Sequence, residues 1–138
     1  MRWDVQHPAY PASAPIGAGL VIRKKAMQVW ADAVAADLDR LSLGRRGTAL
    51  SSGEDNDINL TLLRDGWDLA YLPQLRLIHV IPAARLTLSY QKRLARASFR
   101  DFVRVLDRHG IRPWTPIPRW SVPLRAMRAW FRYRVWSS

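Results

Sequence analysis

Three carboxylates stand close together where a helix is predicted to begin. Glu54, Asp55 and Asp57 follow the polar, glycine-containing loop 45–52 and Gly53. A helix N-terminus stabilises negative charge, and the ionised carboxylate is the form that acts as a general base. Acids in a first turn also stabilise a helix without doing any chemistry, and Ser52 with Asp55 fits a helix-capping pattern. The spacing alone therefore leaves a catalytic and a structural interpretation open.

Two other side chains have types that suit an anionic ligand. His79 follows the apolar run 75–78, so we expect it at the end of a strand. Its imidazole can bind a divalent metal or a phosphate oxygen, or it can be a structural residue. Arg85 follows closely and offers a planar fork of donors that suits a diphosphate. Gly17 and Gly19 either allow a ligand close to the backbone or serve as turn residues.

Helices and short strands must position these residues. Apolar spacing predicts four helices, at about 23–43, 53–66, 86–109 and 124–136. Short apolar runs bounded by glycine or proline predict three strands, at 17–22, 68–72 and 75–80. Residues 1–16 are predicted to be loop, and the proline-rich run 112–123 to be irregular. Strands that alternate with helices predict an α/β fold.

The order of these pieces is more specific than any one of them. The chain contains, in sequence, Gly17-Ala-Gly-Leu-Val-Ile-Arg-Lys24, a predicted helix, Ser52-Gly-Glu-Asp-Asn-Asp57, Gly66-Trp-Asp-Leu-Ala-Tyr-Leu-Pro73 and His79-Val-Ile-Pro-Ala-Ala-Arg85-Leu-Thr87. Over about residues 13–95 this order and spacing resembles the C-terminal half of bacterial family 2 glycosyltransferases of the GT-A type. The resemblance implies an incomplete GT-A, Rossmann-like α/β domain, with short strands, flanking helices and a long C-terminal helix.

The resemblance also implies roles for five residues. In that family the Asp of the acidic pair is the general base, which nominates Asp55 as the catalytic residue. Glu54 and Asp57 would then support the helix start or contact the acceptor. His79 would help bind a divalent metal, Mg or Mn, and Arg85 would hold the diphosphate. The implied reaction is inverting transfer of a sugar from a nucleotide-sugar to a hydroxyl of a carbohydrate or lipid-linked acceptor, in cell-envelope polysaccharide synthesis.

The family's nucleotide-binding half has no counterpart in these 138 residues. That half needs several βα units and carries an Asp-x-Asp metal motif at a strand end. The triplet 37–39 matches that motif in letters but falls within a predicted helix, so we interpret it as solvent-facing charge. We expect residues 1–110 to be the acceptor-side half of a catalytic domain, inactive alone, as a fragment, a truncated reading frame or one partner of a split enzyme. An unpaired sheet edge would favour self-association.

Charge separates the last part of the chain from the rest. The net charge is +11, and residues 1–84 hold nine basic and nine acidic residues, whereas residues 85–138 hold thirteen and two. This asymmetry indicates an anionic partner. We expect residues 111–138 to form a basic tail whose interleaved Trp and Arg suit peripheral contact with a membrane. The alternative function is a small basic module for nucleic acid or anionic membrane, with nucleic acid the less favoured because no nucleic-acid-binding signature is present.

Composition and sequence pattern exclude several other classes of protein. Cysteine is absent, which excludes a disulfide scaffold and any thiolate metal site. No run approaches the roughly 18 apolar residues of a membrane span, and residues 1–8 lack the pattern of a signal peptide. We therefore expect a cytoplasmic protein, peripheral at the inner face of the membrane.

Overall fold

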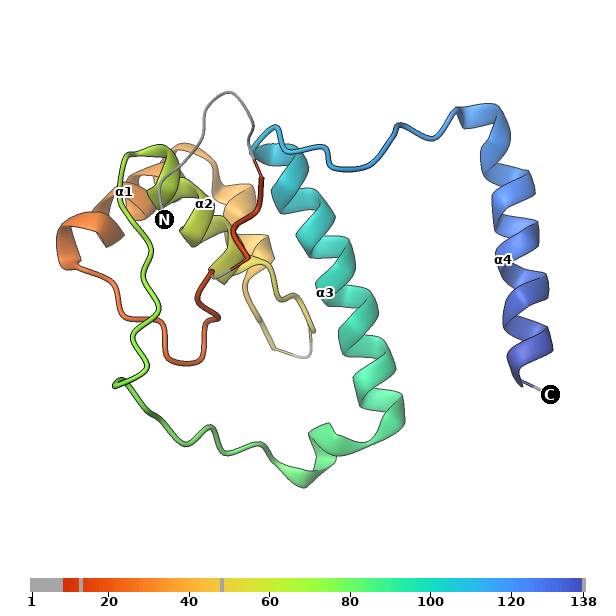
Figure 1. Ribbon diagram of the computed structural model, residues 1–138, viewed down its shortest axis with the longest axis horizontal. Helices are drawn as coiled ribbons and strands as arrows, with labels where there is room; N and C mark the ends of the chain where they lie inside the picture. The colour runs from red at the N-terminus through yellow and green to blue at the C-terminus, as the bar shows by residue number, and fades with distance from the viewer. Residues whose placement is uncertain (1–8, 13, 48, 138) are drawn as a thin grey trace.

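A computed structural model describes residues 9–12, 14–47 and 49–137 of the chain, with side chains as far as Tyr133. Within these residues four α-helices follow one another, α1 (Lys24–Ala36), α2 (Glu54–Arg64), α3 (Leu88–Arg108) and α4 (Val122–Ser137) (Figure 1). Three short 3-10 helices accompany them, η1 (Leu38–Leu43), η2 (Ala83–Leu86) and η3 (Arg119–Ser121). Of the predicted loop 1–16, residues 1–8 and 13 lie outside the described residues, and the others are in neither helix nor strand.

The central element is α2, which is buried on both sides. Ile58 and Leu62 pack with Ala26 and Trp30 of α1. Leu60 faces the other way and joins a cluster with Leu43, Val105, Leu106 and Ile111. Because Leu60 is completely buried, its truncation to Ala should cost about 2–5 kcal/mol. These contacts hold the first turn of α2 in place.

Both ends of α2 agree with the sequence to within one residue. Gly66 has a φ of 89°, a left-handed conformation that favours glycine, and it ends the helix as predicted. The N-cap is Gly53, with no side-chain cap, so the prediction that Ser52 caps the helix is wrong. A methyl group at Gly53 would lie 3.2 Å from both Asp101 Cβ and Val105 Cγ2, so glycine allows α2 to start close against α3.

The predicted helix 23–43 is two helices. α1 ends before Asp37, whose backbone is extended, and the Asp37 carboxylate then accepts a hydrogen bond from Asp39 N at 3.1 Å to start η1. Asp37 also forms an ion pair with Arg108. Its role is therefore to cap η1 and contact α3, because short acidic side chains compete with the helical backbone for hydrogen bonds.

The α/β fold class is wrong, and with it the incomplete Rossmann-like GT-A domain with short strands. None of the described residues is in a β-strand. Residues 17–19 form a turn, and residues 67–82 run as an irregular segment around the edge of the helices (Figure 1). A strand is stabilised by hydrogen bonds to a neighbouring strand. Across 70–81 the described backbone forms one internal bond, from Leu75 N to Leu72 O at 3.0 Å, and no ladder.

The later helices follow the sequence more closely. α3 and α4 lie within two residues of their predicted starts, and α3 is the expected long helix. The prediction of irregular structure throughout 112–123 is wrong at its end, because Pro123 lies in α4. Proline is tolerated in a first turn, where its missing N–H has no helical partner.

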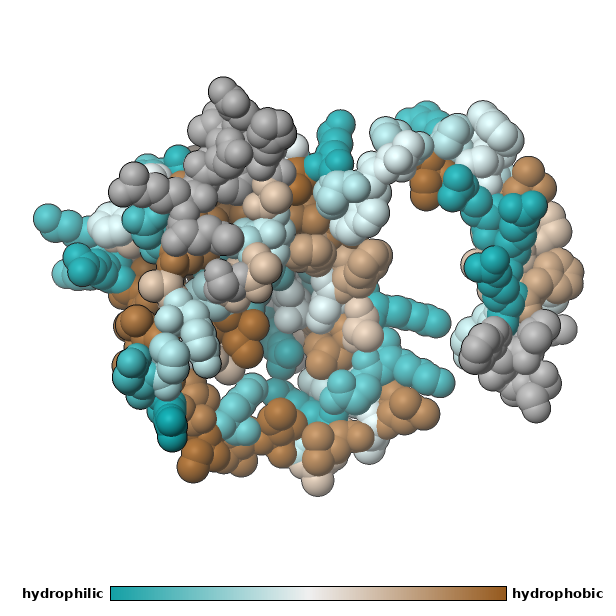
Figure 2. Space-filling view, viewed as in Figure 1, coloured by the Kyte–Doolittle hydropathy of each residue, from teal (hydrophilic) through white to brown (hydrophobic). Residues whose placement is uncertain are grey.

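Much of the chain's apolar surface is uncovered. The accessible surface is 11091 Å², against about 7,400 Å² for a compact monomer of this mass. Exposed apolar side chains lie along 71–88, where Ile78 is 92% exposed, and along α4, which stands apart from the other helices (Figure 2). No helix in the described part of the chain is both long and apolar enough to cross a membrane.

Candidate functional site

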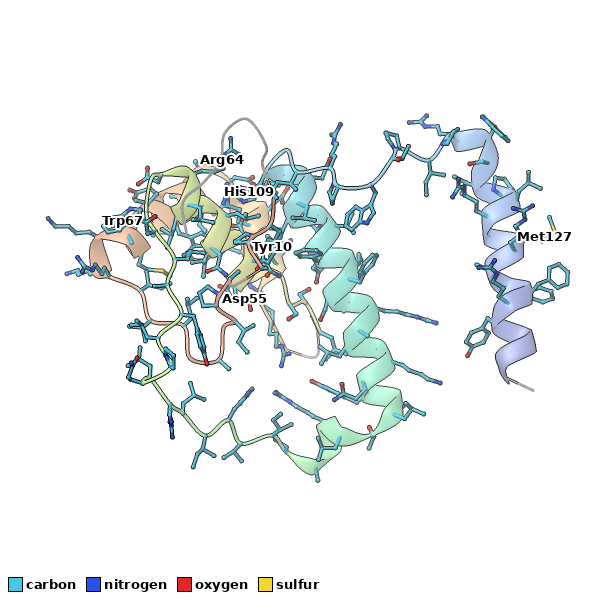
Figure 3. All side chains as sticks on the ribbon, viewed as in Figure 1. Tyr10, Asp55, Arg64, Trp67, His109 and Met127 are labelled. Carbon is cyan, nitrogen blue, oxygen red and sulfur yellow. The ribbon has the colours of Figure 1, made fainter. Side chains whose placement is uncertain are left out.

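Four of the five residues singled out in the sequence line one cavity. This cavity has a volume of about 660 Å³ and lies between the first turn of α2, the turn 16–18, the segment 79–85 and the first turns of α3. Glu54, Asp55, His79 and Arg85 all border it. Figure 3 shows Asp55 pointing into the space that the irregular segment and α3 enclose. We call this cavity the acidic–basic pocket.

Asp55 is held on both carboxylate oxygens. Oδ2 accepts a hydrogen bond from Gly17 N at 2.9 Å, and Oδ1 accepts one from Asn56 N at 2.9 Å. Each carboxylate oxygen has more than one acceptor position, so both can still accept a bond from a ligand. A methyl group at Gly17 would lie 3.5 Å from Oδ2, which is ordinary contact. The turn therefore supplies a donor that orients the carboxylate.

Glu54 borders the same pocket from an exposed position beside Gly44. A methyl group at Gly44 would lie 2.8 Å from Glu54 Oε2. Glycine at that position lets the loop 44–51 pass close to the Glu54 side chain. Two adjacent carboxylates thus form the acidic wall of the pocket.

Arginines form another part of the pocket lining, which we call the arginine wall. Arg45 and Arg85 line the acidic–basic pocket and also a neighbouring cavity of about 440 Å³, which Arg93 borders as well. None of these three arginines forms an ion pair with a described residue. Their donors are free for an anionic ligand. Sequence reasoning missed Arg45 and Arg93; the only signal for Arg93 was its place in the row of arginines along α3.

His79 lies at the edge of the pocket, on the exposed irregular segment. Gly19, opposite that segment, has a φ of 96°, and a methyl group there would lie 2.5 Å from Leu77 Cδ2. The absence of a side chain at Gly19 therefore lets Leu77 pack over the 17–19 turn, two residues before His79. In the described part of the chain no three His, Asp or Glu side chains converge into a group that would hold a metal ion.

Asp57 lies outside the pocket. It is completely buried and accepts hydrogen bonds from Trp30 Nε1 at 2.9 Å, Arg40 Nη1 at 2.8 Å and His109 Nε2 at 2.9 Å. Burial raises the pKa of Asp57, but the bonds from His109 and Trp30 and the charge of Arg40 outweigh it, and the pKa is lowered. This cluster joins α1, η1, α2 and the end of α3, so it stabilises the helices that carry the pocket.

Sequence reasoning missed the Asp57 cluster. His109 and Arg40 are far from Asp57 in the sequence, and their types alone did not indicate a contact. Asp101 was also missed. It is completely buried and accepts hydrogen bonds from Ser52 N at 3.2 Å and Arg100 Nε at 3.0 Å, which ties the loop before α2 to α3.

The comparisons with known proteins identify no relative. No family model, curated protein or solved structure matches this chain. Its function must therefore be inferred from the pocket and its residues.

Proposed function

We propose that this chain carries the acceptor side of a glycosyltransferase site, which transfers a sugar with inversion from a nucleotide-sugar to an acceptor hydroxyl. One observation carries the proposal. Glu54, Asp55, His79 and Arg85 were singled out from the sequence, by residue type and by resemblance, and they border a single cavity. Carboxylates and arginines line the same cavity, a combination suited to a reaction in which a proton is removed and a diphosphate leaves.

Asp55 is the general base in this proposal. Its oxygen accepts the proton of the acceptor hydroxyl as the hydroxyl oxygen forms a bond to the anomeric carbon. The bond from that carbon to the diphosphate oxygen breaks, and its electron pair leaves with the diphosphate. The hydrogen bonds from Gly17 and Asn56 hold the carboxylate in one orientation. A positioned base contributes typically about 10²–10⁴-fold to the rate.

The arginine wall offsets the charge of the leaving group. Arg85 and Arg45 border the same cavity as Asp55, and guanidinium groups bind phosphate oxygens through paired donors. A divalent ion would supply further compensation for the diphosphate charge. We propose that His79 contributes one of its ligands and that the others come from the part of the site that binds the donor.

That donor-binding part would come from polypeptide outside these 138 residues. The segment 70–82 supports this, because its apolar side chains are exposed and its described backbone forms no ladder. Val80, next to His79, is 81% exposed. An extended apolar segment of this kind pairs readily with the edge of another sheet. Such pairing would cover the exposed side chains and bring a nucleotide to the arginine wall.

Complementation tests the proposal directly. The chain would be co-expressed with the nucleotide-binding half of a family 2 glycosyltransferase of known donor, and nucleoside diphosphate release would be measured with a panel of acceptors. We expect release only when both parts are present, with loss of release on Asp55→Asn and not on Asp32→Asn. Asp32 is exposed on α1, away from the pocket. Release that is equal in the Asp55→Asn and Asp32→Asn assemblies would contradict the assignment.

Calorimetry of the chain alone is the complementary measurement. UDP, GDP and dTDP would each be titrated in the presence of Mn²⁺. We expect no binding until the donor-binding part is restored. Micromolar binding of one nucleotide by the chain alone would mean that it forms a donor site unaided, which contradicts the divided site proposed here.

A further inference from the structure

α4 has two distinct faces. At 100° per residue, Leu124, Met127 and Phe131 fall within one arc of about 60°. Arg125, Arg128 and Arg132 fall within a second arc beside it, and Trp130 extends the apolar arc on the far side from the arginines. Figure 2 shows hydrophilic side chains on the inner side of α4 and apolar ones on its outer side. In Figure 3, Met127 points outward, away from the other helices.

The apolar residues Leu124, Met127 and Phe131 of α4 lie outside the core of the protein. Leu124, Met127, Trp130 and Phe131 are each about half exposed. Of the α4 residues whose side chains are described, 122–133, none belongs to the two apolar clusters around α2. α4 packs on η3, and Trp120 in η3 is itself 76% exposed. The exposed surfaces of Leu124, Met127 and Phe131 therefore remain available for a partner.

The charge of this region has a single sign. No Asp or Glu follows Asp107, whereas Arg119, Arg125, Arg128, Arg132 and Arg134 lie in or just before α4. Arg125 donates to Ser121 Oγ at 3.3 Å, and neither Arg128 nor Arg132 forms an ion pair with a described residue. The charge on this helix is not balanced within the described chain, so the partner must be anionic.

We propose that α4 binds along the surface of an anionic membrane. Its apolar face would enter the boundary between headgroups and acyl chains, and its arginines would contact lipid phosphates. Trp side chains favour this boundary, because the ring is apolar and its N–H is polar. The sixteen residues of α4 would extend about 24 Å along the surface.

An anionic bilayer is the partner that uses both faces at once. Nucleic acid would bind the arginines and leave Leu124, Met127 and Phe131 in water. A protein groove would cover the apolar face, yet it would need acidic groups placed along the whole arginine row. In an anionic membrane, the apolar acyl chains lie directly beneath a continuous layer of lipid phosphates, so both faces of α4 would find a partner.

This inference does not depend on the proposed transfer reaction. It concerns residues outside the acidic–basic pocket, and it predicts that the protein binds to a membrane surface. If both hold, the membrane would present a lipid-linked acceptor near the pocket.

Vesicle sedimentation with the full chain tests the proposal. Vesicles of phosphatidylcholine alone would be compared with vesicles that also contain phosphatidylglycerol, at physiological salt. We expect strong binding only to the mixed vesicles, with a blue shift of Trp fluorescence. Arg128→Gln with Arg132→Gln should weaken binding by about 30-fold. Met127→Ser with Phe131→Ser should weaken it by about tenfold or more.

The matched control is Lys92→Gln with Arg96→Gln, which removes the same charge from exposed positions on α3 that border neither cavity. We expect this pair to change vesicle binding by less than about threefold. Unchanged binding by the Met127/Phe131 variant would overturn the proposal, because the arginines would then act as a plain anion patch. Equal binding to both kinds of vesicle, or an equal loss in the α3 control, would also overturn it. Since α4 lies outside both clusters, urea unfolding of all variants should match the wild type.

Discussion

The backbone N–H of Gly17 donates a hydrogen bond of 2.9 Å to Asp55 Oδ2, which joins the turn before α1 to the first turn of α2. The bond places a main-chain donor against the carboxylate that we propose as the base. A main-chain donor moves less than a side chain, so the carboxylate is oriented before an acceptor arrives. Preorganisation of this kind reduces the cost of reaching the reacting geometry.

Asp55→Asn should abolish transfer in the assembled enzyme with little loss of stability. The amide oxygen can still accept the Gly17 bond, whereas the amide NH2 cannot accept the bond from Asn56 N. Because the amide takes no proton, the rate should fall by about 10²–10⁴-fold. Nucleoside diphosphate release and urea unfolding of the same preparation measure the two effects. Asp32→Asn removes an equal charge from an exposed site. It should change neither the rate of nucleoside diphosphate release nor the free energy of unfolding. A transfer rate near the wild-type value would remove Asp55 as the base.

Arg85→Ala should weaken binding of the diphosphate in the assembled enzyme, because it removes a paired donor from the pocket wall. The loss should be about 1.5–3 kcal/mol, the typical contribution of a hydrogen bond to a charged group. Arg76→Ala is the control, since Arg76 is exposed on the irregular segment and does not border the pocket. Calorimetry with the nucleoside diphosphate compares the two. Equal losses of binding free energy in the Arg85→Ala and Arg76→Ala variants would indicate a general effect of charge and contradict a specific role for Arg85.

His79→Ala should weaken diphosphate binding only when Mn²⁺ is present. An imidazole that binds the ion contributes through the metal, whereas one that contacts phosphate directly contributes with or without it. The same titration with and without Mn²⁺ separates the two cases. An affinity that is unchanged in both conditions would leave His79 without a role in binding, since it is an exposed residue.

Local pattern predicted the helices well and the strands wrongly. Ile58, Leu62 and Gly66 marked the face and end of α2, because helical hydrogen bonds close within the segment itself. The apolar runs 68–72 and 75–80 have the composition of strands, but a strand needs a second segment to pair with. In the described residues no such partner is present.

The pocket was predictable in part. Asp55 and Arg85 came from the order of motifs, which encodes spatial neighbours only through resemblance to a family. Arg45 comes from a loop, and only the fold brings it to the same cavity. Asp57 stands two positions from Asp55, yet it points into the core, because residues two positions apart lie about 200° apart around a helix.

Asp57→Asn should destabilise the chain by about 3 kcal/mol, because Arg40 and His109 would lose the charge that their buried donors contact. The Arg40 side chain is 15% exposed, so water relieves little of this cost. Urea unfolding of the full chain measures the change, and Asp32→Asn should lie within about 0.5 kcal/mol of the wild type. Equal unfolding midpoints for the two variants would show that the cluster contributes nothing measurable.

Acid should destabilise the chain partly through Asp57. The folded-state pKa of Asp57 lies below its ordinary value of 3.8, because the bonds from His109 and Trp30 and the charge of Arg40 together outweigh the effect of burial. Folding therefore favours the carboxylate form. Its contribution is fully present above the unfolded pKa of about 3.9, and it is lost as the pH falls from there through the folded pKa. The unfolding free energy should fall by at most about 1.4 kcal/mol per pH unit from this one group.

The comparison of wild type and Asp57→Asn isolates the contribution of the Asp57 carboxyl to the pH dependence of the unfolding free energy. The variant lacks the titrating carboxyl, so its unfolding free energy should fall less steeply below about pH 4. Carbon-13 NMR of the Asp57 carboxyl in the wild-type protein gives the folded pKa directly, even if the variant is too unstable to titrate. Parallel pH profiles, together with a carboxyl that titrates at the ordinary Asp pKa, would contradict the assignment. A steeper wild-type profile would show that the buried contacts of Asp57 hold the carboxylate ionised while the helices that carry the pocket remain folded.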